Sequence, residues 1–234
     1  MGRVVAIAGG DLQSSFSINR YAVALTKKEQ ANVLFIGTAS KDNVLYIKNI
    51  KETFRNFRCE VKDLSLTRRE YTEQELDALL NWADLIYIGG GDTVYMMNCW
   101  KKCGLDIKLK NIYRNDSAVL MGISAGAICW FHCGLSDSEE AEKPEGVAYG
   151  WANGMLNLYP AAFCPHYDEK DRDIFDTMLA TKGLSGLALE RDTAFVEDGG
   201  EYFFIKSCES VKGYYMVYEN NTLKKTELEM QLIE

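Results

Sequence analysis

The sequence predicts an α/β protein with a mostly parallel sheet, covered on both faces, and a short antiparallel C-terminal segment. The first observation is that short β-branched runs alternate, up to about residue 131, with stretches whose apolar residues recur at helical spacing. Strands that alternate with helices in this way are typical of parallel sheets. The second is that several of these runs end in glycine-rich turns. The third is length, since 234 residues, 47% of them hydrophobic, can bury a substantial core.

Local patterns support each predicted element in chain order. Strands are predicted at 3–10, 31–40, 59–66, 83–93 and in the first part of 117–131. Helices are predicted at 17–30, 44–57, 72–82 and 94–104, and another follows the strand within 117–131. Thr72 is the expected N-cap of its helix, and Glu75 completes a capping box. Gly104 is expected to end the next helix.

The pattern changes after about residue 135. A charged loop occupies 136–146, and 156–180 is interpreted as a strand, a turn that carries a histidine, and a helix. Four short runs joined by Gly and Asp turns predict antiparallel closing strands at 184–190, 193–198, 201–207 and 213–219. No internal repeat or linker interrupts the chain, so we expect one domain over residues 1–234.

Composition and charge exclude several classes of function. The net charge is −8 and no basic cluster exceeds two residues, so we expect no nucleic-acid partner. No apolar run reaches the roughly 18 residues of a membrane helix, and the amino-terminal segment lacks a signal-peptide cleavage site. We therefore expect a cytoplasmic protein that binds no membrane. Seven cysteines with only two histidines predict free thiols and no metal site, and no cofactor is expected.

Ser124 lies where a buried strand turns into a helix, at the centre of a G-x-S-x-G pattern that begins at Gly122 and ends at Gly126. In a nucleophile elbow the serine occupies a strained strand-to-helix turn, and its neighbours must be small because backbone packs against backbone there. The turn exposes the hydroxyl and leaves N–H groups at the start of the helix free to bind an oxyanion. The alternative is a serine that caps an ordinary α/β turn.

A serine nucleophile needs a base, and the chain has two histidines. His132 comes eight residues after Ser124 on the expected helix, about 12 Å along its axis, which is too far to reach the hydroxyl. His166 follows an apolar strand and should emerge at the sheet edge where ligands bind in open α/β sheets. His166 is therefore the candidate base, and the alternative is a structural histidine.

A third loop at this edge, from Gly89 to Thr93, contains three consecutive glycines. Glycines let the backbone approach a substrate closely, and their N–H groups can bind an anion or an oxyanion. The alternative is a tight strand–helix turn with Asp92 or Thr93 as N-cap. The loop lacks the lysine of a P-loop and the glycine spacing of a dinucleotide site.

In their order, "GGGDT" at 89–93, "GISAGA" at 122–127 and "PHYD" at 165–168 resemble the peptidase E family (aspartyl dipeptidase), with cyanophycinase as a more distant relative. The resemblance extends over nearly the whole chain. It implies a three-layer α/β/α fold related to class I glutamine amidotransferases. It also implies a serine hydrolase with a Ser-His-Glu triad that cleaves small peptides, in the best-known members dipeptides with an N-terminal aspartate.

By position, the resemblance assigns Ser124 as the nucleophile and His166 as the base. The N–H groups of Gly90, Gly91 and Ala125 match the oxyanion hole.

The third triad member should lie within 187–195, where Glu190 matches by residue type. Alignment on "DTA" instead places Arg191 at the carboxylate position, and Asp192 and Asp168 are the other candidates. The choice matters because a histidine without a well-placed carboxylate loses control of its tautomer, at a cost of up to about 10⁴ in turnover.

The expected activity is hydrolysis of small peptides, with Asp-X dipeptides as candidate substrates. Arg172 is the candidate partner for an aspartyl side chain, because a guanidinium pairs well with a carboxylate. The alternative is an exposed helix arginine paired with Asp168 or Asp176. Two other functions stay open: hydrolysis of another small amide, such as a cyanophycin-type β-Asp-Arg bond, and a catalytically silent binding protein. The expected partner is a small peptide, and a homodimer is a possible assembly.

Overall fold

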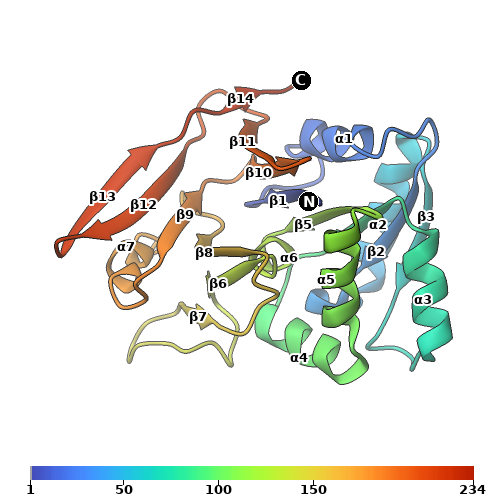
Figure 1. Ribbon diagram of the computed structural model, residues 1–234, viewed down its shortest axis with the longest axis horizontal. Coiled ribbons are helices and arrows are strands. Elements are labelled where there is room, and N and C mark those ends of the chain that lie inside the picture. The colour runs from blue at the N-terminus through green and yellow to red at the C-terminus, as the bar shows by residue number, and fades with distance from the viewer. Residues whose placement is uncertain (1) are drawn as a thin grey trace.

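The computed structural model describes residues 2–234, which form an α/β fold with two β-sheets (Figure 1). The larger sheet has eight strands in the order β14-β11-β10-β1-β5-β4-β2-β3. These strands are β1 (Arg3–Ile7), β2 (Asn32–Ile36), β3 (Glu60–Leu64), β4 (Leu85–Ile88), β5 (Val119–Ile123), β10 (Thr193–Asp198), β11 (Glu201–Lys206) and β14 (Gln231–Leu232). β1 to β5 form the parallel part of the sheet, as predicted, and β10 and β11 extend it as antiparallel strands.

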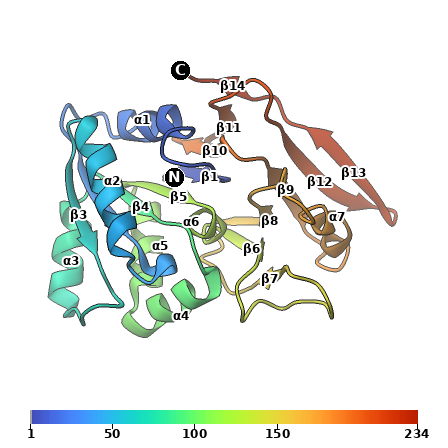
Figure 2. The same cartoon turned by 180° about the vertical axis from the view of Figure 1, so that it is seen from behind.

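Helices cover both faces of the larger sheet. They are α1 (Phe16–Ala24), α2 (Val44–Asn56), α3 (Glu73–Trp82), α4 (Thr93–Cys103) and α5 (Leu105–Asn115). α1 and α2 pack Ile18, Ile50 and Phe54 against one face, and they lie toward the viewer in Figure 2. α3, α4 and α5 pack against the other face in a core that includes Trp100 and Leu109.

Two predicted helix ends are confirmed. Thr72 accepts the N–H of Glu75, and Glu75 accepts the N–H of Thr72, so the capping box of α3 is complete. Gly104, at φ 71°, ends α4 in the left-handed conformation. α5 is absent from the predicted elements, although Leu105, Leu109 and Ile112 recur at helical spacing.

A second, six-stranded sheet contains three of the predicted strands, those within 156–180 and at 184–190 and 213–219, but its separation from the larger sheet was not predicted. Its strands are β6 (Phe131–Ser136), β7 (Gly150–Ala152), β8 (Tyr159–Cys164), β9 (Ser185–Leu189), β12 (Gly213–Glu219) and β13 (Thr222–Glu227), in the order β13-β12-β9-β8-β6-β7. One side of it packs on the core shared with α4 and α5 through Phe131, Phe163 and Leu187. The short helix α7 (Ile174–Leu179) covers the other side through Phe175. In Figure 1 this sheet and α7 lie beside the larger sheet, so part of the third layer is a sheet rather than helices.

The helix expected after Ser124 is much shorter than predicted. α6 spans only Ala125–Ile128, and the chain then enters β6. The Trp130 carbonyl accepts the N–H groups of Leu158 and Tyr159, so the backbone is already paired with the second sheet where a helix would continue. The predicted helical placement of His132 is therefore wrong, because this residue lies on β6.

Two further properties follow from the described residues. All seven cysteines are free thiols. Between residues 2 and 234, no helix has both the length and the apolar character required to cross a membrane.

Candidate active site

The backbone at Ser124 has the strained geometry of a nucleophile elbow. Its φ is 55° and its ψ is −115°, at the junction of β5 and α6. A Cβ on Gly122 would lie 2.0 Å from the Gly126 carbonyl oxygen, and a Cβ on Gly126 would lie 2.3 Å from the Ile88 carbonyl oxygen. Contacts this short leave no room for a side chain, so the small residues around Ser124 are required by backbone packing.

His166 lies against the Ser124 hydroxyl. Its Nε2 is 2.7 Å from Ser124 Oγ, a hydrogen-bond distance. The histidine follows β8 at φ 88°, and its N–H bonds the Leu189 carbonyl of the neighbouring strand β9. The ring packs directly on Gly9, where a Cβ would lie 2.3 Å from Nδ1. As predicted, the structure brings His166 and not His132 to the serine, and the His132 ring contacts Asn157 instead.

The His166 ring favours its neutral form. Its pKa is lowered from the ordinary value, first by burial and then by the positive charge of Arg172, with Glu169 opposing. A neutral imidazole at neutral pH has a free lone pair on one nitrogen and can accept the hydroxyl proton of Ser124. The electrostatic environment thus suits a general base.

The carboxylate nearest to the free nitrogen of His166 belongs to Glu169. Its Oε1 lies 3.5 Å from His166 Nδ1, three residues away along the turn. The pair does not meet hydrogen-bond geometry, and Nδ1 is buried without a hydrogen-bond partner. Sequence reasoning missed Glu169, although its place three residues after His166 within "PHYDE" was the available signal.

The structure does not place Glu190 against His166. Glu190 Oε2 accepts the backbone N–H of Lys212 at 2.8 Å instead. Asp168 is also engaged elsewhere, because its two oxygens accept the N–H and Nε–H of Arg191 at 2.9 and 2.7 Å. Asp192 differs from both: its Oδ1 is buried without a partner, next to Gly10.

Only part of the glycine loop is free to bind an oxyanion. The N–H of Gly89 bonds the Ile36 carbonyl, and the N–H of Gly90 bonds the Tyr46 hydroxyl oxygen at 3.3 Å. In the part of the chain that the structure describes, neither Gly91 nor Ala125 donates its N–H to a protein acceptor. Gly91 lines the cavity beside Ser124, so Gly91 and Ala125 remain as the available pair.

The cavity at the serine has a volume of about 510 Å³ and carries both signs of charge. Ser124 and His166 line it together with Arg172, and Asp137 and Glu139 line its rim. Arg172 does not lie on a helix. It lies in the turn that follows His166, before α7 begins.

Arg172 is buried, with only 6% of its surface exposed. Its guanidinium stacks on the Tyr149 ring at 4.4 Å, and one Nη donates to the Leu135 carbonyl at 3.4 Å. Its Nε is 3.9 Å from Glu169 and has no hydrogen-bond acceptor. The alternative of an exposed arginine paired with Asp168 or Asp176 is therefore wrong.

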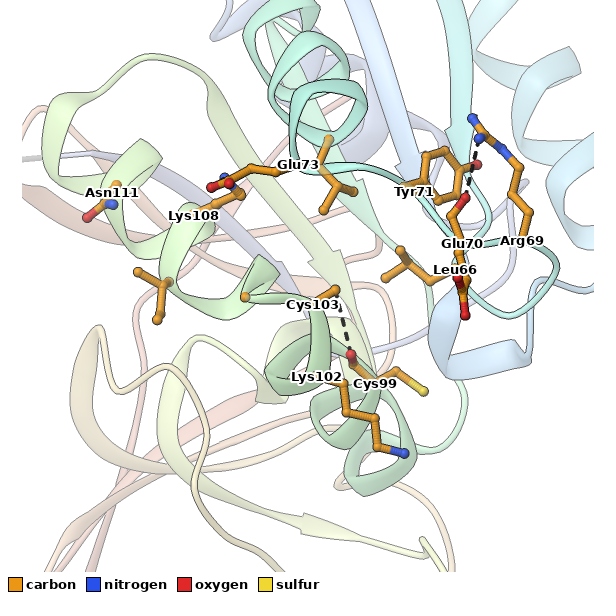
Figure 3. A pocket seen from close by; sticks show the side chains of 13 residues that line it. Leu66, Arg69, Glu70, Tyr71, Glu73, Cys99, Lys102, Cys103, Lys108 and Asn111 are labelled. Atoms are coloured by element: carbon orange, nitrogen blue, oxygen red, sulfur yellow. Dashed lines mark hydrogen bonds and ion pairs between the residues drawn. The ribbon is translucent and has the colours of Figure 1, made fainter.

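A larger hollow of about 860 Å³ lies between the loop before α3 and helices α4 and α5 (Figure 3). Three of its charged groups are paired: Lys108 with Glu73 (and also with Asp77), and Arg69 with Glu75. Its lining contains no serine and no histidine, so it lacks the nucleophile–base pair found at Ser124. No group of three or more potential metal ligands occurs anywhere in residues 2–234.

The chain is similar in sequence to known peptidases. The family model described as Peptidase family S51 matches residues 4–205. The "Uncharacterized peptidase YgaJ" of Bacillus subtilis (strain 168) is 34% identical over 206 residues, which cover 85% of each chain.

Two crystal structures share the fold. A protein from Listeria monocytogenes EGD-e named "Putative Peptidase E Protein" has a TM-score of 0.66 at 18% identity, covering 88% of this chain and 98% of its own. A peptidase from an acI-B1 Actinobacterium has a TM-score of 0.68 at 16% identity, covering 97% of this chain and 94% of its own. At this level of identity the similarity concerns the fold alone.

Proposed function

The chain belongs to peptidase family S51, a family of serine peptidases, and we propose that it hydrolyses short peptides with a free amino end through Ser124 and His166. The observation that carries this proposal is the 2.7 Å contact between His166 Nε2 and Ser124 Oγ, made on a strained elbow. A serine that merely capped a helix would need no imidazole at its hydroxyl.

In the proposed reaction, His166 Nε2 takes the proton of Ser124 Oγ as the oxygen attacks the scissile carbonyl carbon. The carbonyl oxygen becomes an oxyanion, to which Gly91 and Ala125 donate their N–H groups. The tetrahedral intermediate collapses, His166 gives its proton to the leaving amine, and an acyl-enzyme forms. Water, deprotonated by His166, then attacks the acyl carbon and releases the carboxylic acid and free Ser124.

We assign Glu169 as the carboxylate that orients His166. The 3.5 Å separation from Nδ1 is longer than a hydrogen bond, but such contacts commonly shorten when substrate binds. Glu169 is the only carboxylate within ion-pairing distance of the His166 ring among the described residues. Asp192 is the second candidate, because its buried oxygen lacks a partner and lies beside the same Gly9–Gly10 turn.

We further propose that substrates with an acidic first residue are preferred. Arg172 lines the cavity that contains Ser124, and its guanidinium has an Nε without an acceptor, so its positive charge is available to pair with a substrate carboxylate. Asp137 and Glu139 place negative charge at the rim of the same cavity, where it would attract the α-ammonium group of a short peptide.

A panel of dipeptides tests the substrate preference. Faster cleavage of Asp-X than of Ala-X, with loss of activity on N-acetylated peptides, is the expected result. Preferential cleavage of a β-Asp-Arg bond would instead support the cyanophycin-type alternative. Absence of hydrolysis together with no reaction toward a fluorophosphonate probe would support the silent binding protein.

A further inference from the structure

The glycine loop that contains Gly91 has no side chains on its three glycines to hold its backbone conformation. Glycine is also the most conformationally free residue. Gly91 adopts φ 136° and approaches so closely that a Cβ there would lie 2.3 Å from the Ala39 carbonyl oxygen. An oxyanion donor must nevertheless be held in place before the reaction, because its benefit depends on preorganisation.

Four N–H groups of this loop, from Gly89 to Thr93, bond acceptors outside it. Two involve backbone acceptors: the N–H of Gly89 bonds Ile36, and the N–H of Asp92 bonds Ala39 at 2.9 Å. The other two involve side chains: the N–H of Thr93 bonds the Ser138 hydroxyl at 3.0 Å, and the N–H of Gly90 bonds the hydroxyl of Tyr46. The bond to Tyr46 is the one side-chain anchor on a glycine of the loop. It also acts nearest the serine, since a Cβ on Gly90 would lie 3.3 Å from Ser124 Cβ.

Tyr46 is itself rigidly held. Its ring makes an edge contact with Phe35 at a centroid distance of 5.2 Å, and its backbone N–H bonds the Asn43 side chain that caps α2. A Cβ on Gly89 would lie 3.0 Å from the Tyr46 ring, so the ring also packs on the loop. Burial raises the pKa of Tyr46, which keeps the phenol neutral.

We propose that Tyr46 is a positioning residue for the oxyanion hole: its hydroxyl binds the Gly90 N–H and thereby holds the next peptide so that Gly91 can donate to the oxyanion. This inference rests on the proposed function of Ser124. It assigns a role in catalysis to a residue of α2 that does not line the cavity at Ser124.

The test is Tyr46→Phe, which removes only the hydroxyl oxygen. Loss of an oxyanion donor costs about 10² to 10³ in kcat, so we expect loosening of one to lower kcat by roughly 10- to 100-fold with KM within about twofold. The concentration of active enzyme is taken as the amount of Ser124 that a fluorophosphonate probe labels at completion, and kcat is calculated per mole of labelled serine. This corrects for unfolded protein. The midpoint of the acid limb of the pH profile should not move, because His166 is unchanged.

Tyr71→Phe is the matched control. The Tyr71 hydroxyl accepts the backbone N–H of Ser65 at 3.2 Å, the same type of bond. Ser65 follows β3, the edge strand of the larger sheet, which lies three positions from β5 in the strand order. We expect the control to lose thermal stability comparable to Tyr46→Phe while keeping kcat.

The outcomes separate the two proposals. A wild-type protein that reacts with the probe and a Tyr46→Phe variant with unchanged or higher kcat would overturn the role of Tyr46 alone. Higher kcat would mean that the phenol competes with the oxyanion for the Gly90 N–H. An equal fall in kcat in Tyr71→Phe would mean that the loss in Tyr46→Phe reflects general destabilisation, and it would overturn the positioning role of Tyr46. A wild-type protein that neither reacts with the probe nor turns over would contradict the proposed function and the role of Tyr46 together.

Discussion

The nucleophile and its base come from regions with different architectures. Ser124 ends a central strand of the parallel sheet, with β1 and β4 on either side. His166 ends β8 in the second sheet, in a turn followed by irregular chain and the six-residue helix α7. In the first region, backbone packing determines the position of Ser124. In the second region, contacts from several turns determine the position of His166.

The two regions also differ in how well their polar groups are satisfied. Around Ser124, the elbow is fixed by close backbone contacts at Gly122 and Gly126 and by the N–H of Ser124, which bonds the Ile7 carbonyl. Around His166, buried atoms of His166, Arg172 and Asp192 lack hydrogen-bond partners. Because unsatisfied buried groups are costly, this second region is where a substrate's charged groups would be stabilising.

The strongest test of the comparison replaces each histidine in turn. His166→Ala should lower turnover by about 10⁴ to 10⁶, since members of a triad act as a unit. His132→Ala should be nearly neutral, because the His132 ring is exposed on β6 and contacts Asn157. Steady-state kinetics on both variants checks this, and an inactive His132 variant beside an active His166 variant would reverse the assignment.

The next test concerns the carboxylate. Glu169→Gln should lower kcat by up to about 10⁴, the cost of losing control of the histidine tautomer. Glu190→Gln is the matched control, because its carboxylate bonds the Lys212 N–H, and it should keep kcat while losing some stability.

The opposite result is informative as well. An active Glu169→Gln variant together with an inactive Asp192→Asn variant would move the triad carboxylate to Asp192. It would place the third group on the first residues after β9 rather than on the turn after β8.

A smaller effect is expected from Arg172. A charge-assisted hydrogen bond to the substrate contributes about 1.5 to 3 kcal/mol, which corresponds to a roughly 10- to 150-fold preference for Asp-X over Ala-X in kcat/KM. Arg172→Ala should abolish that ratio and leave Ala-X turnover unchanged. A preference that survives the substitution would exclude Arg172 as the specificity residue, and Arg191→Ala is then the variant to measure.

The smallest expected effect is a shift in pH dependence. The reaction needs neutral His166, and its pKa is lowered below the ordinary value of 6.5. Activity should therefore be full at neutral pH and fall only as pH drops through the lowered pKa, with the acid midpoint of kcat/KM below 6.5. Glu169 raises this pKa, so Glu169→Gln should move the midpoint further down. A midpoint above 6.5 would contradict the dominance of burial.

The first region could be predicted from sequence because its signals are local. The capping box at Thr72, the glycine that ends α4 and the small residues around Ser124 each require a backbone geometry that neighbouring residues reveal. The parallel strands β1 to β5 follow from the same short-range alternation.

The second region could not be predicted in the same way. The end of α6 depends on pairing of Trp130 with residues almost thirty positions later, which no local pattern encodes. Glu190 was the natural triad candidate by residue type, yet its orientation is set by pairing with Lys212 on the chain before β12. The role proposed for Tyr46 depends on a contact across 44 residues, and α2 carries no local sign of it.

The most direct test of the central claim is covalent labelling of the wild-type protein with a fluorophosphonate, followed by peptide mass spectrometry. We predict one adduct, on Ser124, formed in the wild type and lost in both Ser124→Ala and His166→Ala, with all three proteins showing the same circular dichroism spectrum. Labelling of another residue, or a wild-type rate of labelling in the His166 variant, would contradict the assignment of Ser124 and His166 as nucleophile and base.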